Sequence, residues 1–231
     1  MGLFNLKDSN GENEMLQDFY FPTSKKALII FTRNPELGKC KTRLAKSVGD
    51  ETALSIYKFL LKHTANVATS IKADRYVFYS EHIKKGDIWS DDLFRKKLQR
   101  GNDLGDKMAN AFTELLVMGY EKICIIGSDL LDLKSDLVTD AYDKLDQNDV
   151  VLGPALDGGY YLLALKDMYY SIFINKEWGT DSVLDSTLKD LQNSKVILLQ
   201  ELNDIDTLED LKSSNYFSSN KELQKILEHI S

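Results

Sequence analysis

The chain has 231 residues and a net charge of −7, with 43% hydrophobic residues, 28% charged residues and only three prolines. This length gives room for one large domain with a sizeable core, and the composition excludes a disordered or collagen-like chain. The acidic balance argues against nucleic acid or an anionic membrane surface as the main partner. Two cysteines, Cys40 and Cys124, are too few for a disulfide framework or a cysteine-rich zinc site.

No apolar run approaches the roughly 18 residues of a membrane span, and the N-terminal residues lack the layout of a secretory signal. We therefore expect a cytoplasmic protein. One stretch departs from the acidic average, because five cationic side chains and one acid lie between Arg33 and Lys46. The stretch carries +4, so the rest of the chain carries −11. Such an island is either a solvated helix face or an anion-binding site.

In chain order, we expect an N-terminal extension over residues 1–24 and a single domain over residues 25–231. Apolar runs and alternating patterns predict strands, over residues 27–31, 74–80, 97–100, 122–126, 149–152, 160–165 and 196–199. Gly153 and Pro154 are expected to end the fifth of these strands.

Apolar residues at three-to-four spacing predict helices between the strands, from about residue 41, then over 50–70, 104–118, 135–145, 180 to about 192, 208–212 and 222–230. Thr180 or Asp181 can cap the helix that ends near 192. Thr207 and Asp210 resemble a capping box for the next helix. The alternation predicts one α/β domain of three layers on a mostly parallel sheet, with the ligand beyond the carboxyl ends of the strands.

A basic loop follows the first predicted strand directly. Gly38 allows close approach of the backbone to a ligand, and the flanking Lys and Arg groups suit phosphates. The sequence is not a Walker P-loop, because Arg33 stands where the first glycine is needed and Cys40 follows Lys39. The alternative is a charged loop held in solvent.

Acidic residues follow two other apolar strands. Asp129 comes shortly after the strand 122–126, where a carboxylate suits Mg²⁺ or Mn²⁺, although an aspartate there can also simply cap a turn. Asp206 or Asp204 could be a second carboxylate on the same metal, and the Asp-Ile-Asp alternation places both on one face. Helix capping by Thr207 and Asp210 is the competing explanation for this acidic segment.

Glycines and one tryptophan mark three further segments. Asp157, Gly158 and Gly159 lie between two strands, where they form either a hairpin turn or a site of close approach for a sugar or acceptor. Gly101 precedes a predicted helix. Trp178 lies beside flexible backbone as in many carbohydrate sites, although a lone tryptophan more often serves packing. The three histidines have no ligand spacing, Cys124 lies in a buried strand, and the cationic neighbours of Cys40 are expected to lower the pKa of its thiol.

Six segments in this order resemble a family of small bacterial GT-A-fold proteins: ALIIFTRNPELGKCKTRLA, QRGNDLGDKM, GSDLLDL, GPALDGGYYLLAL, EWGTDSVL and DIDTLEDL. These proteins are described as glycosyltransferase-like, or as nucleotide-diphospho-sugar transferases, and some are linked to arsenosugar biosynthesis. The resemblance covers about residues 26–212. A more distant similarity is to the 2-phospholactate guanylyltransferases, which share a Lys-x-Arg-Leu element like the one that begins at Lys41.

The resemblance implies a single GT-A, Rossmann-like domain with a nucleotide bound over the first strand and the basic loop. Arg33, Lys39, Lys41 and Arg43 would hold the pyrophosphate, and Thr32, Gly38, Gly101, Asp103 and Ser128 complete the expected nucleotide-binding set. Asp129 and Asp206 would hold Mg²⁺ or Mn²⁺. Gly158, Gly159, Trp178 and Thr180 are the expected substrate-binding residues, and Asp157 is the candidate catalytic base.

We therefore expect a metal-dependent transferase that moves a glycosyl group from a nucleotide sugar to a small acceptor. A nucleotidyltransferase that releases pyrophosphate would use the same loop and metal, and a non-catalytic nucleotide-binding domain is the third reading. The expected partners are a nucleotide or nucleotide-sugar donor and a small-molecule acceptor, without nucleic acid or a membrane span. The sequence leaves the base, the sugar, the acceptor and the oligomeric state open.

Overall fold

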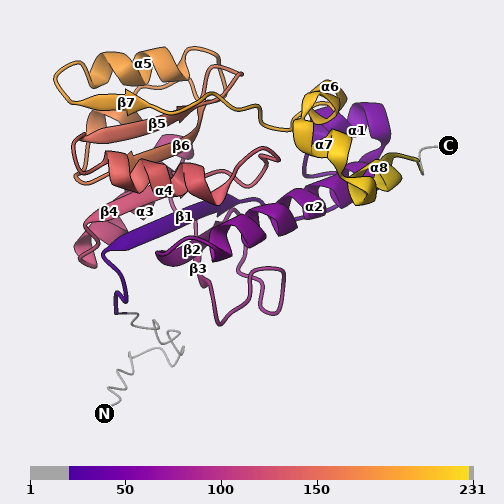
Figure 1. The fold of residues 1–231 in the computed structure, drawn as a ribbon, viewed down its shortest axis with the longest axis horizontal. Coiled ribbons are helices and arrows are strands. Elements are labelled where there is room, and N and C mark those ends of the chain that lie inside the picture. Colours follow the sequence, from indigo (N-terminus) through magenta and orange to yellow (C-terminus); the bar gives the residue numbers. More distant parts are fainter. Residues whose placement is uncertain (1–20, 229–231) are drawn as a thin grey trace, which may run out of the picture.

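The computed structural model describes residues 21–228, so the predicted extension 1–24 lies outside the described residues except for its last four. Within the described chain a seven-stranded sheet has the order β3-β2-β1-β4-β6-β5-β7 (Figure 1). β6 pairs antiparallel with β4 and β5, and the remaining strand pairs are parallel. The predicted mostly parallel sheet is confirmed.

Apolar runs form the central strands because both faces of this sheet are covered. Residues 27–30 of β1, for example, have no exposed surface. The strands are β1 (Lys26–Thr32), β2 (Asp74–Tyr79), β3 (Arg95–Leu98), β4 (Lys122–Ile126), β5 (Val150–Pro154), β6 (Tyr160–Leu165) and β7 (Val196–Leu198).

The helices form a layer on each side of the sheet, which confirms the predicted three-layer α/β/α class. They are α1 (Thr42–Val48), α2 (Asp50–Thr69), α3 (Leu104–Val117), α4 (Ser135–Lys144), the 3-10 helix η1 (Tyr170–Phe173), α5 (Val183–Asp190), α6 (Leu208–Ser213), α7 (Asn215–Ser219) and α8 (Lys221–Glu228). One apolar core joins the sheet to α1, α2, α4, α6 and α8, and a second joins it to α3, η1 and α5. α1, α6, α7 and α8 gather at one end of the molecule (Figure 1). No helix of the described chain is long and apolar enough to cross a membrane.

The expected strand break at Gly153 and Pro154 is wrong, because both residues belong to β5. A Cβ atom at Gly153 would lie 2.5 Å from the Tyr161 ring, so this glycine makes room for the ring instead of ending the strand. The β5–β6 register shifts between Gly153 and Pro154, and such an irregularity accommodates a residue without an N–H group.

The expected cap of α5 is also wrong. This helix begins at Val183 after Ser182, which makes no side-chain cap, while the Thr180 hydroxyl closes a turn by donating to the Glu177 carbonyl at 2.8 Å. The capping box of Thr207 and Asp210 is confirmed at α6. η1 and α7 are too short to leave a periodic pattern, and the predicted end of the last helix lies outside the described residues.

Candidate functional site

Three aspartates converge beyond the carboxyl ends of β4 and β7. Asp129 lies on the segment after β4, and Asp204 and Asp206 lie on the segment that leads from β7 to α6. Each offers a carboxylate oxygen within 4.8 Å of the others. The N–H group of the buried Ile205 donates to the Asp129 carbonyl at 3.0 Å and joins the two segments. The sequence offered Asp204 and Asp206 as alternatives, whereas the fold brings both to Asp129.

Lys41 lies between two of these carboxylates. Its Nζ atom is 2.9 Å from Asp129 Oδ2 and 2.7 Å from Asp206 Oδ1, and only 7% of the side chain is exposed. Burial alone would lower the pKa of Lys41, but the two facing carboxylates reverse this effect and hold the pKa well above its usual value. Lys41 directly precedes α1, and its backbone has the left-handed conformation, with φ 50° and ψ 46°.

The cluster carries an excess of negative charge. Burial, followed by the charges of Asp129, Asp157 and Asp206, raises the pKa of Asp204 to about 6. Carboxylate oxygens are the donors that Mg²⁺ and Mn²⁺ prefer. The donor set of this cluster therefore fits the divalent cation that the fold family implies.

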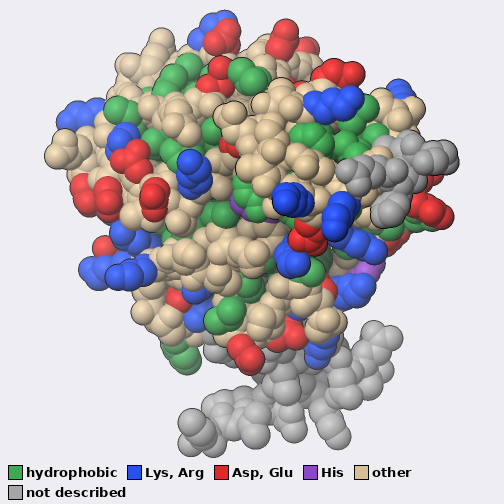
Figure 2. Space-filling model, turned by 45° about the vertical axis from the view of Figure 1, so that its right-hand side comes forward, with side chains coloured by type: hydrophobic (Ala, Val, Ile, Leu, Met, Phe, Trp, Pro, Cys, Tyr) green, Lys and Arg blue, Asp and Glu red, His purple; other side chains and the backbone are tan. Residues whose placement is uncertain are grey.

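The remaining cations of the basic loop lie at the rim of the cluster. Arg43 Nη1 is 3.5 Å from Asp206 Oδ2, and 68% of the Arg43 side chain is exposed. Arg33 is exposed as well, and Gly38 has a φ of 73° that suits its place in the turn. Lys39 Nζ lies 2.7 Å from Glu36 Oε2. Figure 2 brings the side with α1 and α6 forward, where Lys and Arg side chains gather around acidic ones.

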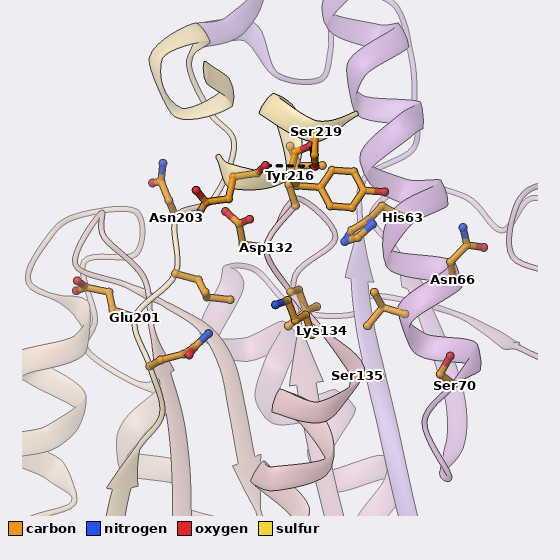
Figure 3. A pocket seen from close by; sticks show the side chains of 16 residues that line it. His63, Asn66, Ser70, Asp132, Lys134, Ser135, Glu201, Asn203, Tyr216 and Ser219 are labelled. Carbon is orange, nitrogen blue, oxygen red and sulfur yellow. Dashed lines mark hydrogen bonds between the residues drawn. The ribbon is translucent and has the colours of Figure 1, made fainter. Parts of the chain in front are cut away.

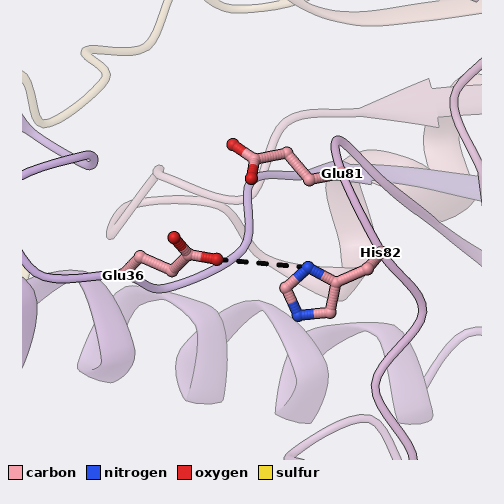
Figure 4. Close-up of side chains that lie close together, drawn as sticks. All are labelled: Glu36, Glu81 and His82. Carbon is pink, nitrogen blue, oxygen red and sulfur yellow. Dashed lines mark ion pairs between the residues drawn. The ribbon is translucent and has the colours of Figure 1, made fainter.

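Glu36 belongs to a second group of possible metal ligands with Glu81 and His82. Glu36 and His82 point toward each other, with 4.0 Å between Oε1 and Nδ1 (Figure 4). Asn34 positions this group, because its Oδ1 atom accepts hydrogen bonds from the backbone N–H groups of Glu81 and His82. Lys39 already compensates the Glu36 charge, so the group is an exposed ion-pair network.

A pocket of about 200 Å³ opens beside the aspartate cluster. Its described lining contains Asp129, Asp157 and Asp204 but no Lys, Arg or His residue. Gly159, Trp178 and Thr180 of the predicted substrate set also line it, together with apolar side chains from α3. The Tyr160 and Trp178 rings pack edge to face, with 6.5 Å between their centroids. The fold thus joins five segments that are far apart in the sequence.

The turn between β5 and β6 contains Asp157 and Gly159, which line the pocket, and Gly158, which does not. Asp157 Oδ1 accepts a hydrogen bond from the Gly159 N–H group at 2.8 Å. Gly158 has a φ of 86°, and a Cβ atom there would lie 2.3 Å from the Asp181 carbonyl oxygen. The Gly158 carbonyl accepts a hydrogen bond from Leu184 at 2.9 Å, so this glycine joins the turn to α5.

Four residues of the predicted nucleotide-binding set make contacts within the protein. Thr32 and Ser128 are buried, with their hydroxyl oxygens 3.4 Å apart at the ends of β1 and β4. Asp103 caps α3 by accepting a hydrogen bond from Asp106 N at 2.8 Å, and a Cβ atom at Gly101 would lie 2.5 Å from Asp106 Cβ. Gly101 and Asp103 do not line the pocket, and nucleotide binding by all four residues stays a prediction.

Both cysteines are buried. Burial raises the pKa of the Cys40 thiol despite the opposing charges of Lys41 and Arg33, so the expected lowering is wrong. The sequence showed the cationic neighbours but not that Cys40 would be only 3% exposed. Burial also raises the pKa of Cys124, in agreement with its predicted role as buried packing.

A larger cleft of about 800 Å³ lies outside this site. Side chains of α2 face those of residues 201–203 across it, and α7 closes one end (Figure 3). The centroids of the His63 and Tyr216 rings are 4.6 Å apart. Burial lowers the pKa of His63. None of the predicted site residues lines this cleft.

The fold is that of the nucleotide-diphospho-sugar transferase superfamily, which confirms the resemblance seen in the sequence. A protein from Desulfovibrio desulfuricans G20, provisionally named a nucleotide-diphospho-sugar transferase, is 26% identical with a TM-score of 0.78, over 90% of this chain and 98% of that chain. Residues 63–180, about half of the chain, match the family described as "Uncharacterized protein conserved in bacteria (DUF2064)". The chain belongs to this family.

Two further solved structures share the fold alone. The 4-diphosphocytidyl-2C-methyl-D-erythritol synthase from Anaerococcus prevotii DSM 20548 is 12% identical, with a TM-score of 0.53 over 86% of this chain and 96% of that chain. A cytidylyltransferase from Leptospira borgpetersenii serovar Hardjo-bovis (strain JB197) is 13% identical, with a TM-score of 0.51 over 90% and 98%. No curated protein matches the sequence.

Proposed function

We propose that the protein is a metal-dependent transferase that binds a nucleotide or nucleotide-sugar diphosphate and transfers a glycosyl group to a small acceptor. The observation that carries this proposal is the pocket beside the aspartate cluster, whose described lining has three carboxylates and no cationic side chain. The name of the 26% identical Desulfovibrio protein supports the same class.

The charge of this pocket favours glycosyl transfer over nucleotidyl transfer to a phosphorylated acceptor. The proposed cation would neutralise Asp129 and Asp204, but a phosphate group in the pocket would still face Asp157, with no Lys, Arg or His residue in the described lining to bind it. The hydroxyl groups of a sugar or polyol can instead donate hydrogen bonds to carboxylates.

The size and the aromatic wall of the pocket agree with a single neutral ring. Pockets that enclose drug-sized ligands have about 300–1,000 Å³, so the 200 Å³ here suit one ring and not a whole nucleotide sugar. Trp178 and Tyr160 provide an apolar surface, and the buried Nε1 atom of Trp178 has no hydrogen-bond partner among residues 21–228. This N–H group packs against Gly105, where a Cβ atom would lie 2.8 Å from it, so Trp178 offers the pocket the apolar part of its ring.

Each part of the site has a role in this proposal. A divalent cation held by Asp129, Asp204 and Asp206 would neutralise the charge that develops on the leaving diphosphate. Arg33, Lys39, Lys41 and Arg43 would bind the phosphates as charge-assisted hydrogen-bond donors. Asp157 would accept the proton of the acceptor hydroxyl.

The first test is a panel of nucleotides and nucleotide sugars with Mg²⁺ or Mn²⁺, read by the melting temperature. A ligand at one hundred times its Kd is expected to raise this temperature by about 5–10 °C. Release of a nucleoside diphosphate from the stabilising donor supports glycosyl transfer, whereas release of pyrophosphate from a nucleoside triphosphate would establish the nucleotidyltransferase. Tight binding without turnover of any donor would establish the non-catalytic domain.

Substitution of the aspartates then tests the roles. Asp157→Asn is expected to lower kcat by about 10²–10⁴-fold at nearly unchanged donor affinity, because only the base is lost. Asp129→Asn is expected to weaken cation binding as well as turnover. Asp92→Asn changes an exposed aspartate outside the pocket and is the matched control. Full activity of Asp129→Asn would contradict the metal assignment.

A further inference from the structure

We propose that Lys41 and the divalent cation exclude each other, so that a cation enters the aspartate cluster only when the Lys41 ammonium group leaves it. This inference rests on the proposed function, because it concerns the cation site of that function. It gives Lys41 two successive positions: between Asp129 and Asp206 before the cation binds, and on the phosphates afterwards.

Geometry and charge carry the competition. The Lys41 ammonium group already takes one oxygen of Asp129 and one of Asp206, at 2.9 and 2.7 Å. An ion bound to the same two carboxylates would have its own oxygen contacts at about 2.0–2.6 Å, which leaves the two cations within a few ångströms of each other. With the Lys41 side chain only 7% exposed, little water screens this repulsion.

The second oxygen of Asp206 does not remove the conflict. Asp206 Oδ2 faces Arg43 Nη1 at 3.5 Å, so a cation that approaches from that side meets a further positive charge. Asp204 has no ion-pair partner among residues 21–228, and it completes the ligand set only if Asp129 and Asp206 are also available. Displacement of Lys41 therefore provides the three-carboxylate site.

A fixed backbone on both sides of Lys41 would confine the exchange to its side chain. Buried Cys40 and Leu44 anchor the chain on both sides of it. Lys41 itself is held in the left-handed region, which is unfavourable for a residue with a Cβ atom and is typical of functional sites. Lys39 and Arg43 are exposed cations of the same loop. A diphosphate would bind on the side of the loop where they lie.

Binding of cation and nucleotide is then cooperative. A diphosphate offers Lys41 new partners and thereby removes the competitor of the cation, so each ligand strengthens the binding of the other. Without a nucleotide, the intact protein binds a free cation weakly. A variant without the ammonium group binds the cation on its own.

The test measures the affinity of Mn²⁺ alone by isothermal titration calorimetry. Lys41→Met is expected to bind Mn²⁺ at least tenfold more tightly than the unchanged protein. Lys96→Met is the matched control, because Lys96 is also buried, with 6% exposure, and lies 2.9 and 2.7 Å from Asp87 and Asp91 outside the cluster. Its Mn²⁺ affinity is expected to stay within twofold. An unchanged or weaker affinity of Lys41→Met, or an equal gain in Lys96→Met, would overturn the inference.

A second measurement uses the unchanged protein and does not depend on the folding of a variant. Lysines are acetylated with acetic anhydride with and without Mg²⁺, and the modified residues are found by mass spectrometry. Lys41 is expected to be protected without Mg²⁺ and modified with it, while Lys96 stays protected in both. Continued protection of Lys41 at Mg²⁺ concentrations that raise the melting temperature would refute the exchange. Absence of Mn²⁺ binding in every variant would overturn the metal dependence of the proposed function together with this inference.

Discussion

Asp210 is expected to hold the segment that carries two of the three clustered aspartates. Its Oδ2 atom accepts hydrogen bonds from Thr207 N and Thr207 Oγ1, both at 2.7 Å, and from Asp206 N at 3.2 Å. Its Oδ1 atom accepts one from Asn203 Nδ2 at 3.2 Å. Asp210→Ala removes all four hydrogen bonds and half of the capping box of α6.

The expected loss of stability follows from these contacts. An N-terminal cap is worth about 1 kcal/mol, and hydrogen bonds to a charged group add about 1.5 kcal/mol or more when they are buried. Asp210 is only partly buried, so water replaces some of what is lost. We expect Asp210→Ala to lower the free energy of unfolding by about 2 kcal/mol in total. For a chain of this size, this corresponds to a fall of about 4–8 °C in the melting temperature.

Urea denaturation at pH 7 measures this loss, and Glu209→Ala is the control in the same helical turn. Glu209 is exposed, so its substitution is expected to change stability by less than about 0.5 kcal/mol. Mn²⁺ affinity is measured on the same proteins, and Asp210→Ala is expected to weaken it because Asp206 loses its backbone support. If Asp210→Ala is as stable as Glu209→Ala, the reasoning about this side chain is refuted.

The effect of Asp210 also depends on pH. Burial raises the pKa of Asp210, but the hydrogen bonds from Thr207 and Asn203 outweigh this and hold it below the usual value. An unfolded aspartate titrates near pH 3.9. The stabilisation by Asp210 is therefore present above about pH 4 and is lost as the pH falls through the lower pKa of the folded state. The difference between Asp210→Ala and the unchanged protein should shrink in that range.

Two further predictions concern buried groups away from the pocket. Asp74 is 8% exposed, lies beside the Arg95 guanidinium, and accepts hydrogen bonds from Thr23 N at 2.7 Å and Tyr120 Oη at 2.6 Å. Asp74→Asn is therefore expected to lower the free energy of unfolding, measured by urea denaturation, by about 3 kcal/mol. A loss below about 1 kcal/mol would contradict this prediction. Cys40 and Cys124 are 3% and 0% exposed, so neither thiol is expected to react with Ellman's reagent before the protein unfolds; rapid reaction of either in the folded protein would refute the assignment.

Most of the fold was predictable because its strands and long helices have patterns that depend on local sequence. The strand Lys122–Ile126 and the capping box of Thr207 and Asp210 are examples in which residue types alone give the observed structure. Gly153 misled the prediction because a glycine signals a turn locally, whereas the need for it arises from Tyr161 on the neighbouring strand. Such tertiary causes leave no local pattern.

The candidate site was predictable in its residues but not in their pairing. Asp129, Asp157 and Trp178 were chosen for their places after strands or beside glycines, and the pocket lining contains all three. The position of Lys41 between Asp129 and Asp206 depends on contacts across 88 and 165 residues of sequence, which no spacing rule reveals. The same limit applies to Cys40, whose burial depends on the packing around α1 and not on its charged neighbours.

The hydrogen bond between Ile205 and Asp129 means that the main chain, and not a ligand, sets the spacing of the three carboxylates. Burial and, after it, the charges of Asp129, Asp157 and Asp206 raise the pKa of Asp204 to about 6, so the ionised form of this carboxylate opposes folding at neutral pH. Activity and stability consequently place opposite demands on this edge of the sheet. Exchange of Asp204 for asparagine is therefore expected to stabilise the protein while it removes one possible cation ligand.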